Sequence, residues 1–157
     1  MARVGIISDT HDRLDKVREA VALFSRLRPE RVVHCGDIVA QFVLKELAGL
    51  TMPVIAVYGN CDGDRAALRQ RADELGFALN EGPYAFALDG KRIIVSHQPL
   101  NPVPDCDFYL HGHTHKPRHE GWRPVIVNPG EACGWLSGRA TAAMLDTETS
   151  DIEFFDL

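Results

Sequence analysis

The sequence contains no long hydrophobic run. No stretch approaches the roughly 20 apolar residues that a membrane-spanning helix needs. The N-terminus also lacks a basic region followed by a long apolar core, so it does not have the pattern of a signal peptide. We therefore expect a cytoplasmic protein that has no membrane partner.

Several motifs and pairings are absent as well. The four cysteines, Cys35, Cys61, Cys106 and Cys133, form no C-x-x-C pair, and in a chain of this size they predict reduced thiols and no disulfide framework. No G-x-S-x-G elbow and no P-loop occurs, which excludes the serine hydrolases and nucleotide-driven motors that carry them. The net charge is -5 with scattered basic residues, so long nucleic acid is not an expected partner.

The composition is that of an ordinary globular protein, with 45% hydrophobic and 25% charged residues. A chain of 157 residues is long enough to bury a core and short enough for one unit. We expect a single domain over residues 1–157, with no linker, repeat or low-complexity segment.

Six short apolar runs each end in a small polar cluster, and nearly every cluster holds a potential metal ligand. The runs are 4–7, 31–33, 54–57, 93–95, 108–110 and 125–127. The polar residues that follow include Asp9, His11, Asp37, Asn60, His97, His113 and His115. Buried strands that end at one rim of a sheet commonly assemble an active site from distant parts of a chain.

The spacing of apolar residues predicts helices between the first strands. They are expected after His11, with Asp12 as a plausible N-cap, over about 39–48, and from about residue 62 to Gly76. Two hairpins are predicted, 83–88 with 91–96 and 140–146 with 151–155. Residues 99–104 and 116–124 read as irregular loops. This order of elements predicts an α/β protein with a parallel sheet core.

Two carboxylates, one carboxamide and four imidazoles suit a pair of divalent ions. A carboxylate at Asp37, after a glycine that lets the backbone bend, could bridge the two ions. His113 and His115 could face the two ions separately or together. Paired ions lower the pKa of a water held between them, and the resulting hydroxide can attack phosphorus. Such a reaction requires no protein nucleophile.

The motifs Asp9-x-His11, Gly36-Asp37, Gly59-Asn60-x-Asp62, His97 and Gly112-His113-x-His115, in this order, resemble the calcineurin-like metallophosphoesterase superfamily. Their local forms are similar to its small prokaryotic phosphodiesterase branch, the YfcE-like and MJ0936-like proteins. The resemblance covers essentially the whole chain, and five motifs in register are a stronger signal than any one of them.

The resemblance implies a four-layer α/β/β/α sandwich of two mixed sheets with flanking helices. It implies that Asp9, His11 and His115 bind one ion, that Asn60, His97 and His113 bind the other, and that Asp37 bridges them. Manganese is the expected ion, with nickel, cobalt, iron and zinc as alternatives. The catalytic set would be Asn60, Cys61 and Asp62. Cys61 either faces the substrate or only fills space, and Asp62 either orients a neighbour or caps the third helix.

Two positions depart from the family pattern. Many relatives have histidine in place of Cys61, and a thiol is a poorer proton donor and phosphate partner. This change favours phosphodiester over phosphomonoester cleavage. Glu131 stands where serine is frequent, and its charge would narrow the choice of anionic substrates if it faced inward.

The predicted function is hydrolysis of a small phosphodiester by a hydroxide that bridges two ions. The alternatives are phosphomonoester or pyrophosphate hydrolysis at the same site, and a non-catalytic scaffold similar to the retromer subunit. A homo-oligomer is compatible with either. His34 and His111 are interpreted as structural histidines, His119 as a surface residue, and Trp122 and Trp135 as core or interface residues.

Overall fold

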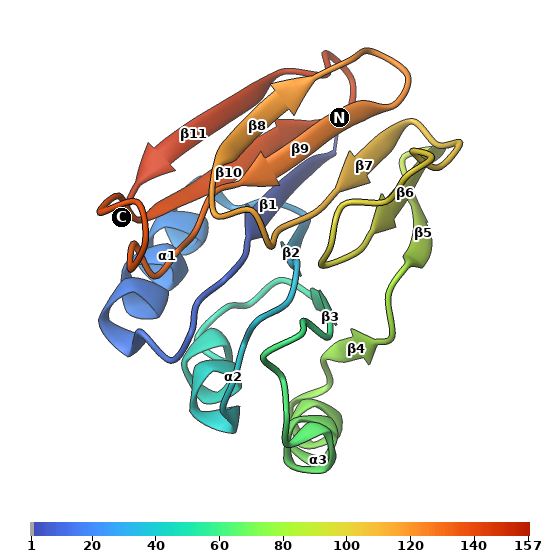
Figure 1. Ribbon diagram of the computed structural model, residues 1–157. Helices are drawn as coiled ribbons and strands as arrows, with labels where there is room; N and C mark the ends of the chain where they lie inside the picture. Colours follow the sequence, from blue (N-terminus) through green and yellow to red (C-terminus); the bar gives the residue numbers. More distant parts are fainter. Residues whose placement is uncertain (1) are drawn as a thin grey trace.

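The computed structural model describes residues 2–157, and its elements alternate between strand and helix only in the first half (Figure 1). The helices are α1 (Leu14–Leu27), α2 (Gln41–Leu47) and α3 (Arg65–Leu75). The strands are β1 (Arg3–Ile7), β2 (Arg31–His34), β3 (Val54–Val57), β4 (Ala78–Asn80), β5 (Tyr84–Leu88), β6 (Lys91–Val95), β7 (Phe108–Leu110), β8 (Pro117–Glu120), β9 (Val125–Pro129), β10 (Thr141–Asp146) and β11 (Ile152–Asp156).

The strands form two mixed sheets. The larger has six strands in the order β11-β10-β1-β2-β3-β4, and the smaller has five in the order β5-β6-β7-β9-β8. Strands β1 to β4 run parallel, as do β6, β7 and β9. The carboxyl ends of the strands within each parallel group therefore reach the same edge of their sheet, which is the arrangement that the polar clusters require.

Alternation along the strands of the six-stranded sheet places apolar side chains in a core layer on each of its two faces. On β1, Ile6 joins the layer between the two sheets, whereas Ile7 joins the layer beneath the helices. On β2, Val33 and Val32 divide in the same way. Because these strands are buried on both faces, they read as continuous apolar runs and not as alternating ones.

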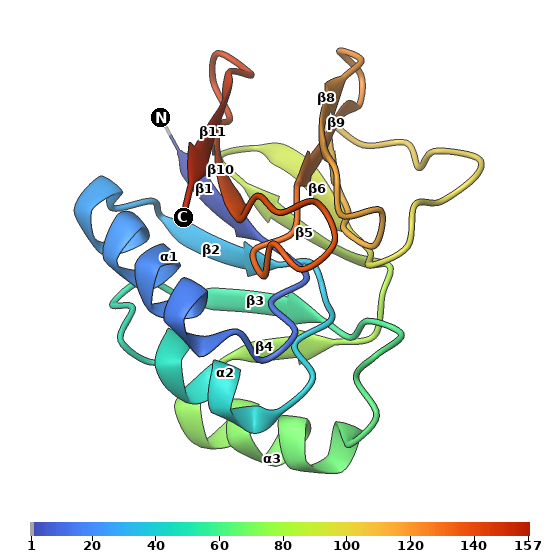
Figure 2. The same ribbon diagram turned by 60° about the vertical axis from the view of Figure 1, so that its left-hand side comes forward.

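All three helices lie on the outer face of the six-stranded sheet (Figures 1 and 2). The expected α/β fold with two mixed sheets is thus confirmed. The outer face of the five-stranded sheet differs in detail from the four-layer expectation. There Leu100 and Cys106, in the segment between β6 and β7, pack on Ile94, Tyr109 and Ile126. In residues 2–157 this outermost layer is a loop and not a helix.

The predicted helices and hairpins occur, but some of their ends differ. Asp12 does not cap α1, because its Oδ1 atom accepts a hydrogen bond from the Ala40 amide at 2.9 Å and Arg13 takes the N-cap position. Gly76 ends α3 in the left-handed conformation, as predicted. Residues 117–120, expected as loop, form β8 because they pair antiparallel with β9. The short β4 was also not predicted.

Neither tryptophan belongs to the core. Trp122 is 86% exposed and Trp135 is 60% exposed. Of the two alternatives, core or interface, the core is therefore wrong for both tryptophans, because a tryptophan in a turn can expose its ring, and the interface stays a prediction. All four cysteines are free, as expected. Across residues 2–157 we find no helix with the length and apolarity needed to span a bilayer.

Candidate metal centre

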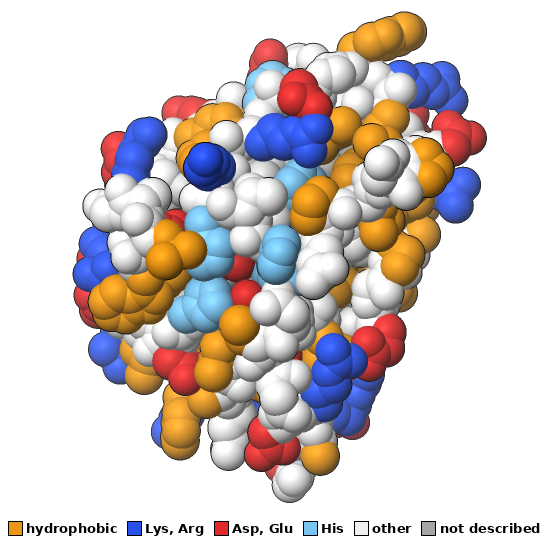
Figure 3. Space-filling view, in the orientation of Figure 1, with side chains coloured by type: hydrophobic (Ala, Val, Ile, Leu, Met, Phe, Trp, Pro, Cys, Tyr) orange, Lys and Arg blue, Asp and Glu red, His pale blue; other side chains and the backbone are white. Residues whose placement is uncertain are grey.

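The polar clusters of both sheets meet at one face of the molecule. Asp9 and His11 follow β1, Asp37 follows β2, Asn60 follows β3, His97 follows β6, and His113 and His115 follow β7. In the space-filling view, histidine side chains gather around acidic ones in the middle of this face (Figure 3). Since the two sheets face each other, the predicted ligands from both converge at this point.

The backbone is unusual at five of these positions. Asp9, His11, Asp37, His113 and His115 all have positive φ, between 39° and 70°. Left-handed backbone is uncommon for residues with a side chain, although aspartate and histidine tolerate it better than most. Such conformations persist only where the surrounding structure enforces them, and they cluster at functional sites.

Two glycines permit the loops to approach so closely. A Cβ atom at Gly59 would lie 2.1 Å from Oδ1 of Asp37, and one at Gly112 would lie 2.0 Å from the Ser8 hydroxyl oxygen. Any side chain at either position would displace a neighbouring loop. The glycines of the Gly-Asn and Gly-His motifs are therefore required by steric contact with the acidic residues.

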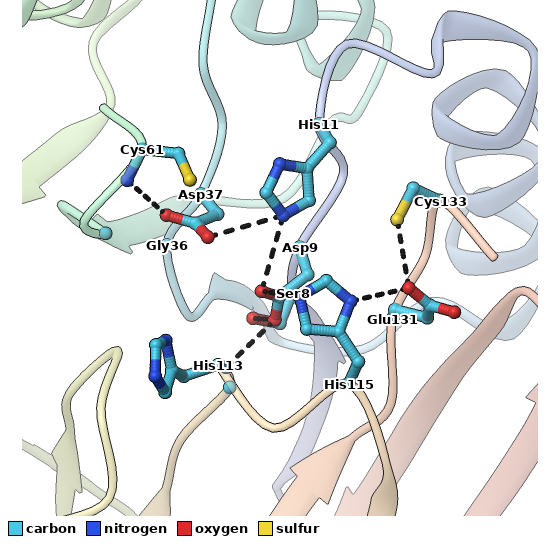
Figure 4. Close-up of polar contacts among 12 residues, drawn as sticks. Ser8, Asp9, His11, Gly36, Asp37, Cys61, His113, His115, Glu131 and Cys133 are labelled. Carbon is cyan, nitrogen blue, oxygen red and sulfur yellow. Dashed lines mark hydrogen bonds and ion pairs between the residues drawn. The ribbon is translucent and has the colours of Figure 1, made fainter. Parts of the chain in front are cut away.

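Four predicted ligands form one compact group. The ligand atoms of Asp9, His11, Asp37 and His115 lie within 4.8 Å of one another. The Nε2 atom of His115 is 3.3 Å from Oδ1 of Asp9, and Nε2 of His11 is 3.3 Å from Oδ2 of Asp37 (Figure 4). The side chains thus point their ring nitrogens and carboxylate oxygens toward a common centre.

The other three predicted ligands form a chain of contacts that begins at Asp37. The Nε2 atom of His97 lies 3.2 Å from Oδ2 of Asp37, the same oxygen that faces His11. The rings of His97 and His113 are 5.2 Å apart between centroids, and Nδ1 of His113 is 3.0 Å from Oδ1 of Asn60. The structure therefore brings all seven predicted ligands together, with Asp37 in the middle.

These residues fit a metal site by a criterion that does not depend on resemblance. Oδ1 of Asp9, Nε2 of His11 and Nε2 of His97 are buried and have no hydrogen-bond partner in residues 2–157. Buried polar atoms are almost always satisfied, and an orphaned one indicates an ion or another missing partner. Carboxylate oxygens with imidazole nitrogens suit first-row divalent ions.

Electrostatics in this group favour charge on both partners. Burial alone would raise the pKa of Asp37, yet its contacts with His11 and His97 lower it well below the ordinary value. The carboxylates of Asp37 and Asp9 raise the pKa of His11 to about 10. Burial opposes charge on His97, but Asp37 still raises its pKa. Divalent ions would take the place of these protons, because metal ligands must be deprotonated.

Asp62 holds two of the loops together. Its Oδ2 atom accepts hydrogen bonds from the backbone amides of Gly59 at 2.7 Å and Asp37 at 3.1 Å, and Oδ1 accepts one from Val39 at 2.6 Å. The cap of α3 is Asp64, which accepts from the Ala67 amide at 3.1 Å. Of the two interpretations of Asp62, the helix cap is wrong, and the contacts with the Asp37 and Gly59 amides agree with the orienting role, which stays a prediction.

Cys61 lies at the rim of the group and is exposed. Its backbone amide donates a hydrogen bond to Oδ1 of Asp37 at 2.8 Å. Burial, followed by the charge of Asp37, raises the pKa of the thiol. A thiol held protonated is a weak nucleophile.

Glu131 and Ser8 contribute contacts that the sequence did not reveal. Glu131 is fully buried, and its Oε2 atom lies 2.5 Å from Nδ1 of His115. The direction of this side chain was open, and it faces a ligand and not the substrate opening. The Ser8 hydroxyl donates to Oδ2 of Asp9 at 2.6 Å. For Glu131, the sequence did contain one signal, because a glutamate stands there in a run of otherwise apolar and small residues.

The remaining histidines behave as interpreted. His34 is fully buried, with Nε2 3.0 Å from the Thr10 hydroxyl and Nδ1 accepting from the Gly36 amide at 3.1 Å. His111 is also fully buried, and its Nδ1 atom is 2.9 Å from the Gly112 carbonyl oxygen. His119 is exposed. The first two support the loops from behind the site.

Residues 2–150 match the family described as the calcineurin-like phosphoesterase superfamily domain. The chain belongs to this family. It is 35% identical over 158 residues, 95% of each chain, to the phosphodiesterase MJ0936 of Methanocaldococcus jannaschii. A solved archaeal phosphodiesterase superposes with a TM-score of 0.89 and 32% identity, covering 99% of both chains.

Two more distant structures share the fold alone. The phosphoesterase YfcE of E. coli has a TM-score of 0.75 at 23% identity, covering 98% of both chains. Vps29 of Chaetomium thermophilum has a TM-score of 0.72 at 13% identity, covering 100% of this chain and 97% of the other. Membership of this family and the cluster of candidate metal ligands together identify the protein as a metal-dependent phosphoesterase.

Proposed function

We propose that the protein hydrolyses a small phosphodiester with the help of two divalent ions. The observation that supports this most directly is the position of one oxygen, Oδ2 of Asp37, which faces both His11 and His97. Asp9, His11 and His115 would hold one ion, and Asn60, His97 and His113 would hold the other. Manganese is the ion that we expect, although nickel, cobalt, iron and zinc have compatible ligand preferences.

Bound divalent ions would acidify a water and neutralise charge on the phosphoryl oxygens. The chain itself supplies the placement of the groups around them. Asp37 would hold the two ions as neighbours, while Asp62 fixes the amides of the loops that carry Asp37 and Asn60. Cys61 retains its proton and is not the nucleophile, which agrees with direct attack by water-derived hydroxide.

A cleft of about 340 Å³ opens beside two of the proposed ligands, Asn60 and His97. Its wall is mostly polar and includes Arg65, Glu81 and Gln98. Arg65 is paired with Glu81 at 2.7 Å, so the two charges offset one another. A cleft of this size suits one substituent of a small ester and not a long strand. We infer a small substrate, with no nucleic-acid or membrane partner.

Two other functions have some support. Phosphomonoester or pyrophosphate cleavage would use the same ligands, but Cys61 disfavours it. A protein-binding role without catalysis is compatible with the fold that the chain shares with Vps29. The complete set of ligand positions favours the enzyme. We further propose that the chain forms one domain, acts in the cytoplasm and can form a homo-oligomer.

Hydrolysis of bis-p-nitrophenyl phosphate and of p-nitrophenyl phosphate, measured with chelator or with added manganese, tests the proposal. We expect manganese-dependent release of nitrophenol from the diester and much weaker release from the monoester. Activity on the monoester alone would refute the proposed diesterase function and show that the protein is a phosphomonoesterase. No activity on either with manganese, nickel, cobalt, iron or zinc would favour the protein-binding role.

A further inference from the structure

The carboxylate of Glu131 is the least expected contact in the centre. Glu131 follows β9, and its ionisable side chain is 0% exposed. The next two residues, Ala132 and Cys133, are also fully buried. Figure 4 shows Glu131 behind His115, on the side of the imidazole away from Asp9. Burial of a carboxylate costs several kcal/mol unless it is paired and hydrogen-bonded. Its presence therefore requires an explanation in its contacts.

The two oxygens of Glu131 share the Leu136 amide and otherwise have different partners. Oε1 accepts hydrogen bonds from the amide and the hydroxyl of Ser137, at 2.5 and 2.6 Å, and from the amide of Leu136 at 3.0 Å. Oε2 lies 2.5 Å from Nδ1 of His115 and accepts hydrogen bonds from the Leu136 amide at 3.2 Å and the Cys133 thiol at 3.3 Å. One oxygen is thus anchored in the loop that follows, and the other is directed at the imidazole.

The hydrogen bond to Glu131 determines which nitrogen of His115 is free. A carboxylate can only accept, so Nδ1 carries the proton, and in the neutral imidazole that binds a metal Nε2 then carries the lone pair. Nε2 is the atom that faces Oδ1 of Asp9 at 3.3 Å. An ion between Nδ1 and Oε2 does not fit, because two ligands of one ion at about 2.1 Å each lie about 3 Å apart at octahedral angles and farther apart at tetrahedral ones, whereas these two atoms are 2.5 Å apart.

We propose that Glu131 is a positioning residue that fixes the tautomer and the ring orientation of His115, and thereby strengthens the metal site to which His115 belongs. The inference rests on the proposed function only for the existence of that site. A carboxylate behind a ligating histidine raises the basicity of the ligand, and the loss of such a partner typically weakens metal binding 10- to 100-fold.

Glu131→Gln is the direct test, and Ser137→Ala is its matched control. The first keeps the size of the side chain but removes its charge and places an amide where the Nδ1 proton needs an acceptor. The second removes a hydrogen bond from Oε1 and leaves Oε2 and His115 untouched. Manganese binding to each purified variant is measured by titration calorimetry, and folding is checked by circular dichroism.

We expect roughly 10- to 100-fold weaker manganese binding at one site in Glu131→Gln, and a change below about 2-fold in Ser137→Ala. Equal effects in the two variants would overturn the proposal, since they would show that Glu131 only stabilises the loop. Unchanged manganese binding in Glu131→Gln would overturn it as well.

A measurement on the unmodified protein covers the case in which Glu131→Gln does not fold. Nitrogen-15 NMR of the metal-free protein above neutral pH distinguishes the two tautomers of His115. The Nδ1–H form supports the proposal, and the Nε2–H form contradicts it. The tautomer does not depend on phosphodiester hydrolysis, so a protein without that activity would refute the proposed function and leave this inference intact.

Discussion

The Oδ2 atom of Asp37 lies 3.2 Å from the Nε2 atom of His97. The same oxygen is 3.3 Å from Nε2 of His11, whereas Oδ1 accepts the Cys61 amide at 2.8 Å. One carboxylate oxygen thus contacts both proposed ligand sets, and the other is held by the backbone. If any single residue couples the two sets, it is Asp37.

Replacement of Asp37 by Asn should remove this coupling. Asn keeps a carbonyl oxygen for the Cys61 amide but carries no charge to share between two cations. We expect fewer than two manganese ions per chain in metal analysis, and a loss of diesterase activity well above the 100-fold seen for residues that only support ligands.

Asp12→Asn is the matched control for Asp37→Asn. It neutralises a nearby carboxylate whose role, acceptance of the Ala40 amide, a carbonyl oxygen can also fill. Its manganese content and activity should stay near those of the unmodified protein. Two bound ions in Asp37→Asn would refute the bridging role.

The Asp62 side chain supports the site only through backbone amides, so its replacement should first of all lower the free energy of unfolding. In Asp62→Asn only one of the two side-chain oxygens remains, and at least one buried amide of Gly59, Asp37 or Val39 loses its acceptor. A loss of roughly 1–3 kcal/mol in the free energy of unfolding is expected for the metal-free protein. Denaturant titration measures it.

The exposed cap Asp64 provides the comparison for Asp62. Asp64→Ala removes the acceptor of the Ala67 amide and should cost about 1 kcal/mol, with no effect on manganese binding. Asp62→Asn should weaken manganese binding as well, because Asp37 and Asn60 share the loops that it ties. Full manganese affinity in a destabilised Asp62→Asn would contradict the role in orientation.

The arrangement of the predicted ligands could be inferred from the sequence because each strand end can be recognised from a few neighbouring residues. Val32-Val33 and Ile55-Ala56-Val57 are buried on both faces, so an apolar run followed by a polar residue marks a strand end at the rim. His34 and His111 could be separated from the ligands by strand alternation.

The contacts that were not predicted depend on distant chain segments. Nothing near Asp12 indicates that it would bond to Ala40 instead of capping its own helix. Residues 117–120 contain proline and charged residues, which have low strand propensity, and become β8 only through pairing with β9. Glu131 is held by His115 and by the backbone amides of Leu136 and Ser137, and none of these contacts is visible in the local sequence.

Cys61→Ala should retain most diesterase activity. The thiol accepts a hydrogen bond from the Asn60 side-chain amide at 3.5 Å. Burial, followed by the charge of Asp37 and a contact with it, raises the pKa of the thiol and keeps it protonated near neutral pH. The backbone amide of residue 61 also donates to Asp37, and alanine preserves that hydrogen bond. We expect kcat/KM for bis-p-nitrophenyl phosphate to fall less than about 5-fold, a barrier change of about 1 kcal/mol. A loss as large as that of Asp37→Ala would show that the thiol is chemically required.

The buried His34 should make the metal-free protein sensitive to acid. Burial lowers the pKa of His34 to about 4, from an ordinary value of 6.5. The unfolded chain therefore binds one more proton than the folded protein between these two values. The stabilisation is fully present above pH 6.5 and is lost as the pH falls to about 4, with a ceiling of about 3 kcal/mol.

Unfolding by denaturant at pH 4 to 7, with chelator present, tests this dependence. The free energy of unfolding of His34→Gln should fall less steeply with decreasing pH than that of the unmodified protein. Some slope will remain, because burial also lowers the pKa of His111. His11 has a raised pKa, so its contribution changes above pH 6.5 and does not enter this window. His119→Gln, at an exposed position, should leave the slope unchanged. Parallel curves for His34→Gln and the unmodified protein would show that His34 does not resist protonation in the fold.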